Sequence, residues 1–186
     1  MENSKFLMDI LAELTENAKQ IPAADLERFA EFVLSGKRVY VVGVGRSGFA
    51  ARAFSNRLMH LGLTVYFVGE PTTPAITAED VLIIGSGSGE TGSLVNYAQK
   101  AHQIGARIAT VTIRPEGTIG SLSEVVIAIP GSTPKGGQKD ARQSKQPMAN
   151  AFEQMSWLVY DTIIFILMDK LNKTSDEMFK LHANLE

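Results

Sequence analysis

One stretch constrains the fold of this chain more than any other: residues 81–91, with the sequence VLIIGSGSGET. Its branched apolar residues predict a buried strand over residues 81–85, and its small residues predict a tight loop before a helix. Such a loop aims several backbone N–H groups at one point, and the dipole of the following helix favours a negative charge there. We expect this loop to bind a phosphate through Ser86, Gly87, Ser88, Gly89, Glu90 and Thr91.

The residues around these glycines indicate which class of phosphate compound the loop can bind. No lysine follows them as it does in a Walker loop, and Glu90 adds negative charge where a triphosphate would need positive charge. A nucleoside triphosphate is therefore not expected. One phosphate on a small molecule fits the loop better.

A second loop of the same kind occurs earlier, in the sequence VYVVGVGRSG of residues 39–48. An apolar strand again ends in glycines and a serine before a helix, and Arg46 and Ser47 could face a phosphate or a sugar hydroxyl. In a parallel sheet both loops lie at the carboxyl ends of their strands, where ligands of such folds bind. We interpret them as two walls of one site.

Strand and helix patterns alternate along the chain. Strands are predicted at residues 39–43, 64–68, 81–85, 107–113 and 125–129. Helices are predicted at residues 47–61, 91–104, 118–122 and 148–171, with two amphipathic helices before the first strand and a capping-box pattern opening a short last helix at residues 174–177. This alternation predicts an α/β fold, a three-layer, doubly wound, five-stranded parallel sheet of flavodoxin-like order 2-1-3-4-5.

The length of 186 residues suits a single domain. We divide it into N-terminal helices over residues 1–36, a sheet core over 37–130, a lid-like loop over 131–147 and C-terminal helices over 148–186. The loop is rich in glycine, proline and cations. It could fold over an anion or remain a solvated surface segment, and its cations are Lys135, Lys139, Arg142 and Lys145.

Composition excludes several classes of partner and compartment. A net charge of −2 gives no reason to expect nucleic acid, and the absence of cysteine excludes disulfides. The first residues lack a signal-peptide pattern, which favours the cytoplasm. The apolar run at residues 155–168 is interrupted by Asp161 and is shorter than the ~20 residues of a membrane span. It predicts a buried helix, and because that helix is apolar nearly all round we expect a subunit interface and a homo-oligomer.

Few titratable residues are candidates for catalysis. Glu153 lies among apolar neighbours early in the last long helix, which suits a base that takes a carbon-bound proton. The alternative is a helix cap, since Asn150 precedes Glu153 by three residues. His60 and His182 are weaker candidates, because a half-buried and a surface histidine would explain them as well. No cluster has metal-ligand spacing, and no cofactor is expected.

A dinucleotide enzyme is the rival interpretation of the first loop. Residues 43–48, GVGRSG, match the glycine fingerprint of dinucleotide-binding folds, and Glu70 stands where a ribose-binding acid would be. Against it, a dinucleotide half-site has no need of a second serine-rich loop, and Pro71 after Glu70 suggests a turn. We therefore give the fingerprint little weight.

The motifs GVGRS at residues 43–47 and SGSGET at residues 86–91 resemble the sugar isomerase (SIS) domain, a family of phosphosugar isomerases and phosphosugar-binding regulators. The resemblance extends to the hexulose-phosphate isomerases of that family over the whole chain. It rests further on RLMHLG at residues 57–62, VGE at 68–70, QPM at 146–148, FEQ at 152–154 and HANLE at 182–186.

This resemblance implies interconversion of 3-hexulose 6-phosphate and fructose 6-phosphate, the second step of formaldehyde fixation by the ribulose monophosphate route. The implied partner is the 3-hexulose-6-phosphate synthase that joins formaldehyde to ribulose 5-phosphate. Ser47, Ser86, Ser88 and Thr91 would hold the phosphate and sugar, and Glu153 would accept the proton, with His60 or His182 assisting. The implied assembly is a tetramer in which the C-terminal segment reaches a neighbour's site.

Two other functions remain open from the sequence. The same loops serve in phosphosugar-sensing regulators, although the acidic N-terminal helices offer no basic recognition helix. An aldose–ketose isomerase for another phosphosugar also fits, because a phosphate grip does not identify the sugar.

Overall fold

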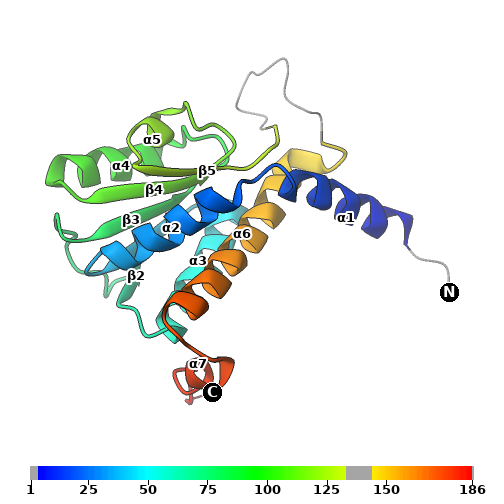
Figure 1. Ribbon diagram of the computed structural model, residues 1–186. Helices are drawn as coiled ribbons and strands as arrows, with labels where there is room; N and C mark the ends of the chain where they lie inside the picture. Colours follow the sequence, from blue (N-terminus) through cyan, green and yellow to red (C-terminus); the bar gives the residue numbers. More distant parts are fainter. Residues whose placement is uncertain (1–3, 133–143, 186) are drawn as a thin grey trace.

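The computed structural model describes residues 4–132 and 144–185. Its centre is a parallel sheet in the order β2-β1-β3-β4-β5, which confirms the predicted fold and strand order (Figure 1). The strands are β1 (Val39–Gly43), β2 (Val65–Phe67), β3 (Val81–Gly85), β4 (Arg107–Thr112) and β5 (Val125–Ala128).

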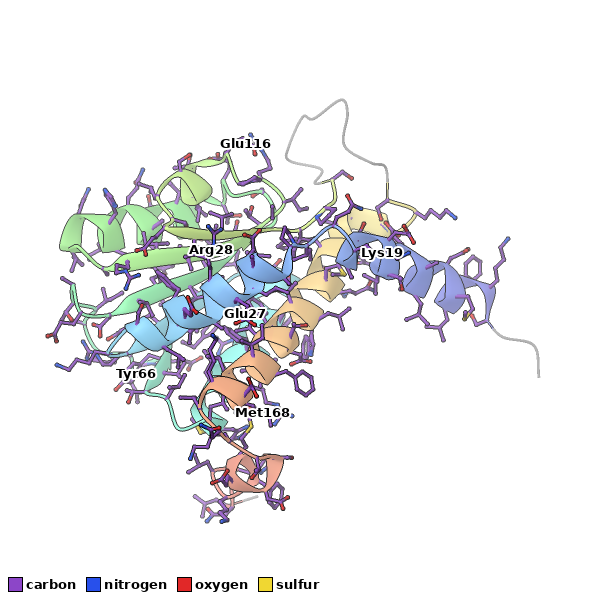
Figure 2. The ribbon with its side chains drawn as sticks, viewed as in Figure 1. Lys19, Glu27, Arg28, Tyr66, Glu116 and Met168 are labelled. Atoms are coloured by element: carbon purple, nitrogen blue, oxygen red, sulfur yellow. The ribbon has the colours of Figure 1, made fainter. Side chains whose placement is uncertain are left out.

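Helices cover both faces of the sheet and make three layers (Figure 1). Side chains alternate along each strand, so Val39 and Val41 join one apolar core while Tyr40 and Val42 join the other. Helices α2 (Ala23–Ser35), α3 (Gly45–His60) and α6 (Asn150–Lys170) pack on the first core. Helices α4 (Gly92–Ile104) and α5 (Thr118–Ser121) pack on the second, and side chains fill both layers (Figure 2).

One difference from the predicted boundaries is at the start of α6. The sequence predicts a helix from residue 148, but a 3₁₀ turn (Pro147–Ala149) comes first and the α-helix begins at Asn150. The cause is the backbone of Met148 and Ala149, whose φ angles of 57° and 76° lie in the left-handed region. The helix therefore enters from a sharp turn just before Glu153.

The two terminal helices lie at opposite ends of α6. Helix α1 (Lys5–Ala18) extends away from the sheet beside the first turns of α6, and α7 (Ser175–Phe179) lies beyond its last turn (Figure 1). The predicted capping box of α7 is confirmed. Thr174 N donates to Glu177 Oε2 at 2.9 Å, and Glu177 N donates to Thr174 Oγ1 at 3.3 Å.

Helix α6 is a core helix with one side left uncovered. Its residues Phe152, Met155, Val159, Ile163 and Leu167 are buried at helical spacing. In the described chain, α6 with the turn before it is the one stretch long and apolar enough to span a membrane, yet half of it is buried within the fold. The opposite side exposes the large apolar residues Trp157, Leu158 and Phe165.

Candidate functional site

The two serine-containing loops meet at one edge of the sheet, as the sequence predicts. Strands β1 and β3 are neighbours, and their register pairs Gly43 with Gly85. Each loop therefore starts from the same level of the sheet and leads into a helix, α3 from the first loop and α4 from the second. This brings two helix N-termini to one place, with backbone N–H groups that have no intrahelical partner.

Glycines let the first loop turn closely into α3. Gly45 has a φ of 60°, and Gly48 lies so near β1 that a side-chain carbon there would be 2.7 Å from the Gly43 carbonyl oxygen. The dinucleotide-like spacing of these glycines thus serves close packing of helix on strand. Arg46 and Ser47 fall in the first turn of α3.

The second loop buries two hydroxyl groups. Ser86 is only 3% exposed, and no partner for its Oγ lies within hydrogen-bond distance among the described residues. Ser88 Oγ is 3.4 Å from Thr91 Oγ1 and accepts a hydrogen bond from Glu90 N at 3.3 Å. A buried hydroxyl without a partner costs about 1–3 kcal/mol, so a ligand oxygen is the natural partner of Ser86.

Glu90 has a different place from the rest of its loop. Its carboxylate accepts hydrogen bonds from the backbone N and the Oγ1 of Thr118, both at 2.8 Å, and these bonds lower the pKa of Glu90. Thr118 begins α5, so Glu90 ties the loop to that helix. The negative charge of Glu90 is therefore paired with protein donors, and no local pattern in the sequence predicts this pairing.

Helix α6 brings Glu153 to both loops. The Glu153 carboxylate accepts a hydrogen bond from Arg46 Nε of the first loop at 2.5 Å. The preceding residue, Phe152, packs on the second loop, because a side-chain carbon at Gly87 would lie 3.1 Å from its ring. The alternative of a helix cap is wrong, since Ala149 occupies the N-cap position and no side chain caps the helix.

An open groove runs beside Glu153. Its volume is about 520 Å³, and its polar residues Arg46, Glu153 and Gln154 lie at one part of an otherwise apolar wall. The apolar wall consists of Leu11, Leu14, Phe49, Ala50, Trp157 and Leu158. Phe49 is 67% exposed, so the groove presents an apolar side chain to solvent in the single chain.

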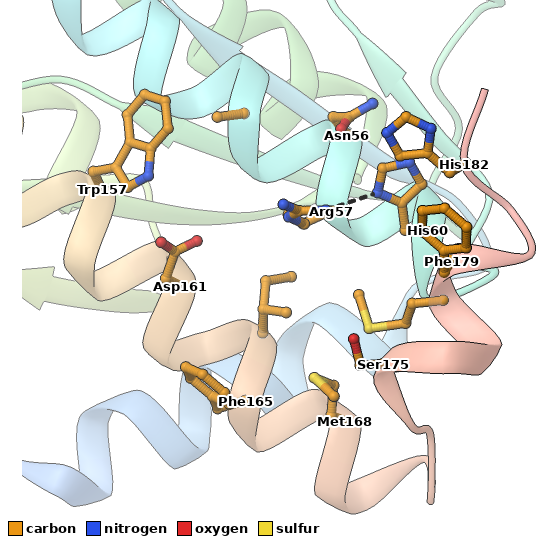
Figure 3. Close-up of a pocket in the computed structure, with 13 residues that line it drawn as sticks. Asn56, Arg57, His60, Trp157, Asp161, Phe165, Met168, Ser175, Phe179 and His182 are labelled. Atoms are coloured by element: carbon orange, nitrogen blue, oxygen red, sulfur yellow. Dashed lines mark hydrogen bonds between the residues drawn. The ribbon is translucent and has the colours of Figure 1, made fainter. Parts of the chain in front are cut away.

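His60 and His182 lie at the other end of α3. His60 is the last residue of that helix, thirteen positions after Ser47, which places it about 20 Å away. Its ring stacks on His182, with centroids 5.3 Å apart. Figure 3 shows both rings at the end of a cavity that also contains Arg57, Trp157 and Asp161. A single chain does not bring the predicted histidines to the predicted phosphate loops.

The histidine cavity has a volume of about 490 Å³. His60 is buried there, and burial lowers its pKa, with further lowering by the charge of Arg57 and by His182. Arg57 Nη1 is 3.4 Å from His60 Nδ1. His60 is therefore neutral near pH 7, a form that can donate or accept a proton. Arg57 and Asp161 were not predicted as site residues, although Asp161 stands out in the sequence as a charge within an apolar run.

The structure also bears on the dinucleotide alternative. Glu70 forms an ion pair with Arg52, whose guanidinium lies 4.0 Å from the centre of the Phe67 ring. The acid that would bind a ribose is thus engaged by an arginine of α3. The turn predicted at Pro71 is present, because Thr73 N donates to Glu70 O at 3.0 Å.

Two further predictions concern metal-binding groups and the cations of the lid-like loop. Within residues 4–132 and 144–185, no group of three or more histidine, cysteine, aspartate or glutamate side chains is placed to hold a metal ion. Of the cations in the lid-like loop, Lys145 is described and exposed, whereas Lys135, Lys139 and Arg142 lie outside the described residues.

Comparison with known proteins identifies relatives along the whole chain. The SIS domain family matches residues 33–156. The 3-hexulose-6-phosphate isomerase of Bacillus subtilis is 41% identical over 186 residues, covering 100% of both chains. The enzyme of the same name from Mycobacterium gastri is 36% identical over 174 residues, covering 94% of this chain and 86% of that one.

A solved structure gives the same result for the fold. A Methanococcus jannaschii protein, whose crystal structure infers a molecular function of 3-hexulose-6-phosphate isomerase, superposes with a TM-score of 0.79. It is 32% identical, and the match covers 96% of this chain and 95% of that one.

Proposed function

The chain belongs to the 3-hexulose-6-phosphate isomerases of the SIS domain family, and from that membership we infer how its residues divide the work of this reaction. It is a ketose isomerase of the ribulose monophosphate pathway, interconverting 3-hexulose 6-phosphate and fructose 6-phosphate. The observation that carries the assignment to residues is the meeting of two phosphate-type loops beside one carboxylate, Glu153.

The chemistry asks for one base and one phosphate anchor. A proton leaves C2 of the 3-ketose, a 2,3-enediol forms, and the proton returns to C3 while the hydroxyl proton moves from the oxygen on C2 to the oxygen on C3. One carboxylate above the C2–C3 bond can make both carbon transfers. We assign this role to Glu153.

The phosphate is assigned to the serine loops. The unpartnered hydroxyl of Ser86, the hydroxyls of Ser88 and Thr91, and the first-turn N–H groups of α4 supply neutral donors around one point. Ser47 of the first loop faces the sugar in this scheme. Because the 6-oxygen is esterified, the C3 ketone has no hydroxyl that closes a five- or six-membered ring, so the substrate enters open-chain and needs no ring-opening base.

We propose that the working unit is a homo-oligomer, with the tetramer implied by the resemblance. Trp157 borders both the groove beside Glu153 and the cavity of the histidines, so exposed apolar surface connects the two. Phe6 of α1, Phe49 of α3 and Phe165 of α6 are also exposed. Surface of this kind is typical of an interface between subunits.

A two-fold interface along this face has a chemical consequence. If α6 of one chain pairs antiparallel with α6 of another, the histidine end of each lies opposite the serine loops of its partner. His60 or His182 can then move the proton between the two substrate oxygens or stabilise the enediolate. This arrangement would give the predicted catalytic histidines access to a substrate, which the single chain does not provide because it holds them too far from its own loops.

The partners of the pathway follow from the substrate. We propose that the chain works beside a 3-hexulose-6-phosphate synthase in the cytoplasm. The synthase makes the open-chain ketose that this chain uses as its substrate, so the two enzymes act in succession.

The test is a coupled assay with purified protein. A synthase makes 3-hexulose 6-phosphate in place from formaldehyde and ribulose 5-phosphate, and the formation of fructose 6-phosphate is followed. The wild type is expected to form product, while Glu153→Gln is expected to form almost none. Asp169→Asn, an exposed carboxylate of the same helix, is the matched control and should behave like the wild type. Absence of product from a folded wild type that binds phosphosugars would overturn the assignment.

A further inference from the structure

The hydrogen bond between Arg46 and Glu153 joins residues 107 positions apart in the sequence. Arg46 lies in the first turn of α3 and Glu153 in the first turn of α6. Within the described part of the chain, the bond from Nε to Oε2 is the one hydrogen bond of the Arg46 side chain. The arginine that the sequence assigned to substrate phosphate is therefore paired with the carboxylate assigned as the base.

The surroundings make this pairing effective. The Glu153 side chain is 18% exposed and that of Arg46 is 64% exposed, so the acid is largely withdrawn from water while the arginine approaches it from the solvent side. Apolar residues of the groove, including Phe49 and Trp157, lie around the pair. Charges attract more strongly there than in open water, and cover by another subunit would strengthen the attraction.

The geometry leaves half of the carboxylate available. Arg46 donates through Nε to Oε2, and in the described residues no hydrogen bond engages Oε1. One oxygen is thus fixed while the other can face the C2–C3 bond of a ketose. A carboxylate held by one oxygen has a defined orientation, which matters because proton transfer from carbon requires close alignment.

The phosphate loops do not need this arginine. Their donors are the hydroxyls of Ser86, Ser88 and Thr91 and the N-terminus of α4. Phe152 places the start of α6 on Gly87, so Glu153 stands beside the second loop while Arg46 comes from the first. The positive charge of Arg46 is directed at the base.

We propose that Arg46 is a positioning residue that orients the catalytic carboxylate of Glu153 and is not a phosphate ligand. This inference rests on the proposed function of Glu153 as the base. It assigns a different role to each loop. The second loop holds the phosphate, and the first loop orients the Glu153 carboxylate through Arg46.

The test separates positioning from phosphate binding. Arg46→Gln is compared with Arg52→Gln, a matched control in which another arginine of α3 loses its glutamate partner, Glu70. For Arg46→Gln we expect kcat to fall by between about tenfold and about a hundredfold. The KM and the inhibition constant of inorganic phosphate should stay within about twofold of the wild type. Arg46→Lys should recover part of kcat, and Arg52→Gln should keep the wild-type kcat.

Other outcomes overturn the proposal. A rise in KM and in the phosphate inhibition constant with unchanged kcat would make Arg46 a phosphate ligand. Unchanged kinetics would remove any role. A wild type without isomerase activity would instead refute the proposed function. In that case the melting temperatures of Arg46→Gln, Glu153→Gln and the double variant, compared as a double-mutant cycle, would still measure the interaction between the two side chains. Additive shifts in that cycle would contradict it.

Discussion

The two ends of α3 carry different kinds of site. At its N-terminal end, serine hydroxyls and backbone N–H groups from two loops lie beside a carboxylate, all within one chain. At its C-terminal end, two stacked histidines line a cavity of about 490 Å³ that the loops of the same chain do not approach. The first end carries the groups proposed to hold the phosphate and remove the proton, and the second carries the two histidines proposed to assist that transfer.

The electrostatics of the two ends explain this division. At the loop end, Glu90 and Glu153 are both engaged by protein donors, so helix N-termini and hydroxyls are left to meet the phosphate. At the histidine end, burial and the charge of Arg57 keep His60 neutral. These contacts favour an anion at the first end and an uncharged His60 imidazole at the second.

The largest expected effect separates the two ends by chemistry. Glu153→Gln should lower kcat by about 10²–10⁴-fold, because it removes the base. His60→Gln and His182→Ala should each cost less, on the order of tenfold, since an oxygen-to-oxygen proton shift has other routes. Steady-state kinetics with the coupled assay measures all three. A histidine variant as slow as Glu153→Gln would break the comparison by placing the essential base at the histidine end.

The next effect tests the anchor. Ser88→Ala should raise KM for the phosphosugar by between about tenfold and about a hundredfold with little change in kcat, since a hydrogen bond to a charged group contributes about 1.5–3 kcal/mol. Ser55→Ala is the control, because Ser55 Oγ bonds within α3 to Arg52 O at 2.8 Å. An unchanged KM in Ser88→Ala would move the phosphate away from the second loop.

A smaller effect concerns the packing of α6 against the end of β3, directly before the second loop. A side-chain carbon at Gly85 would lie 2.8 Å from the Tyr160 hydroxyl, which is fully buried and whose pKa burial raises. Gly85→Ala should destabilise the fold by about 1–3 kcal/mol. Adding Tyr160→Phe should recover part of that loss by removing the oxygen. Chemical denaturation of the two single variants and the double variant measures the coupling, and additive losses would show that the two residues do not meet.

The smallest effect is the pH dependence at the histidine end. The pKa of folded His60 lies below the value of about 6.5 expected for the unfolded chain, so above that pH both states are neutral and full stability is present. As pH falls below about 6.5 the unfolded state binds the proton first, and stability is lost until the folded pKa is passed. His60→Gln should flatten the melting temperature between pH 7 and pH 5.5. An equally steep loss in that variant would place the titrating group elsewhere.

Local patterns predicted the sheet well. Strands β1 and β3 have the predicted ends because each apolar run stops at a glycine followed by a small polar loop, a strong local signal. Strand β2 is shorter than predicted and covers Val65–Phe67, although the flanking residues Thr64 and Val68 still exchange backbone hydrogen bonds with β1. Parallel order then followed from general rules of connection, which also placed the two loops together.

Long-range pairings could not be predicted in this way. Arg46 and Glu153 are 107 residues apart, and Glu90 and Thr118 are 28 apart, so no periodicity links them. The alternative of a helix cap at Asn150 was wrong because Ala149, in a left-handed conformation, occupies the N-cap position one residue earlier. The candidate residues of the site could thus be predicted from the sequence, whereas the hydrogen bonds that pair them with other protein groups are visible only in the structure.

The most direct test of the comparison mixes the two ends in one oligomer. Glu153→Gln breaks the loop end and His182→Ala breaks the histidine end, and the two variants with different tags are co-expressed and purified as mixed assemblies. If the ends of different chains form one site, some sites in the mixture combine an intact loop end with an intact histidine end. Fructose 6-phosphate formation should then rise to about a quarter of the wild-type rate, several times the mean of the two parents. A rate equal to that mean would contradict the account, because it would show that each chain works with its own histidines.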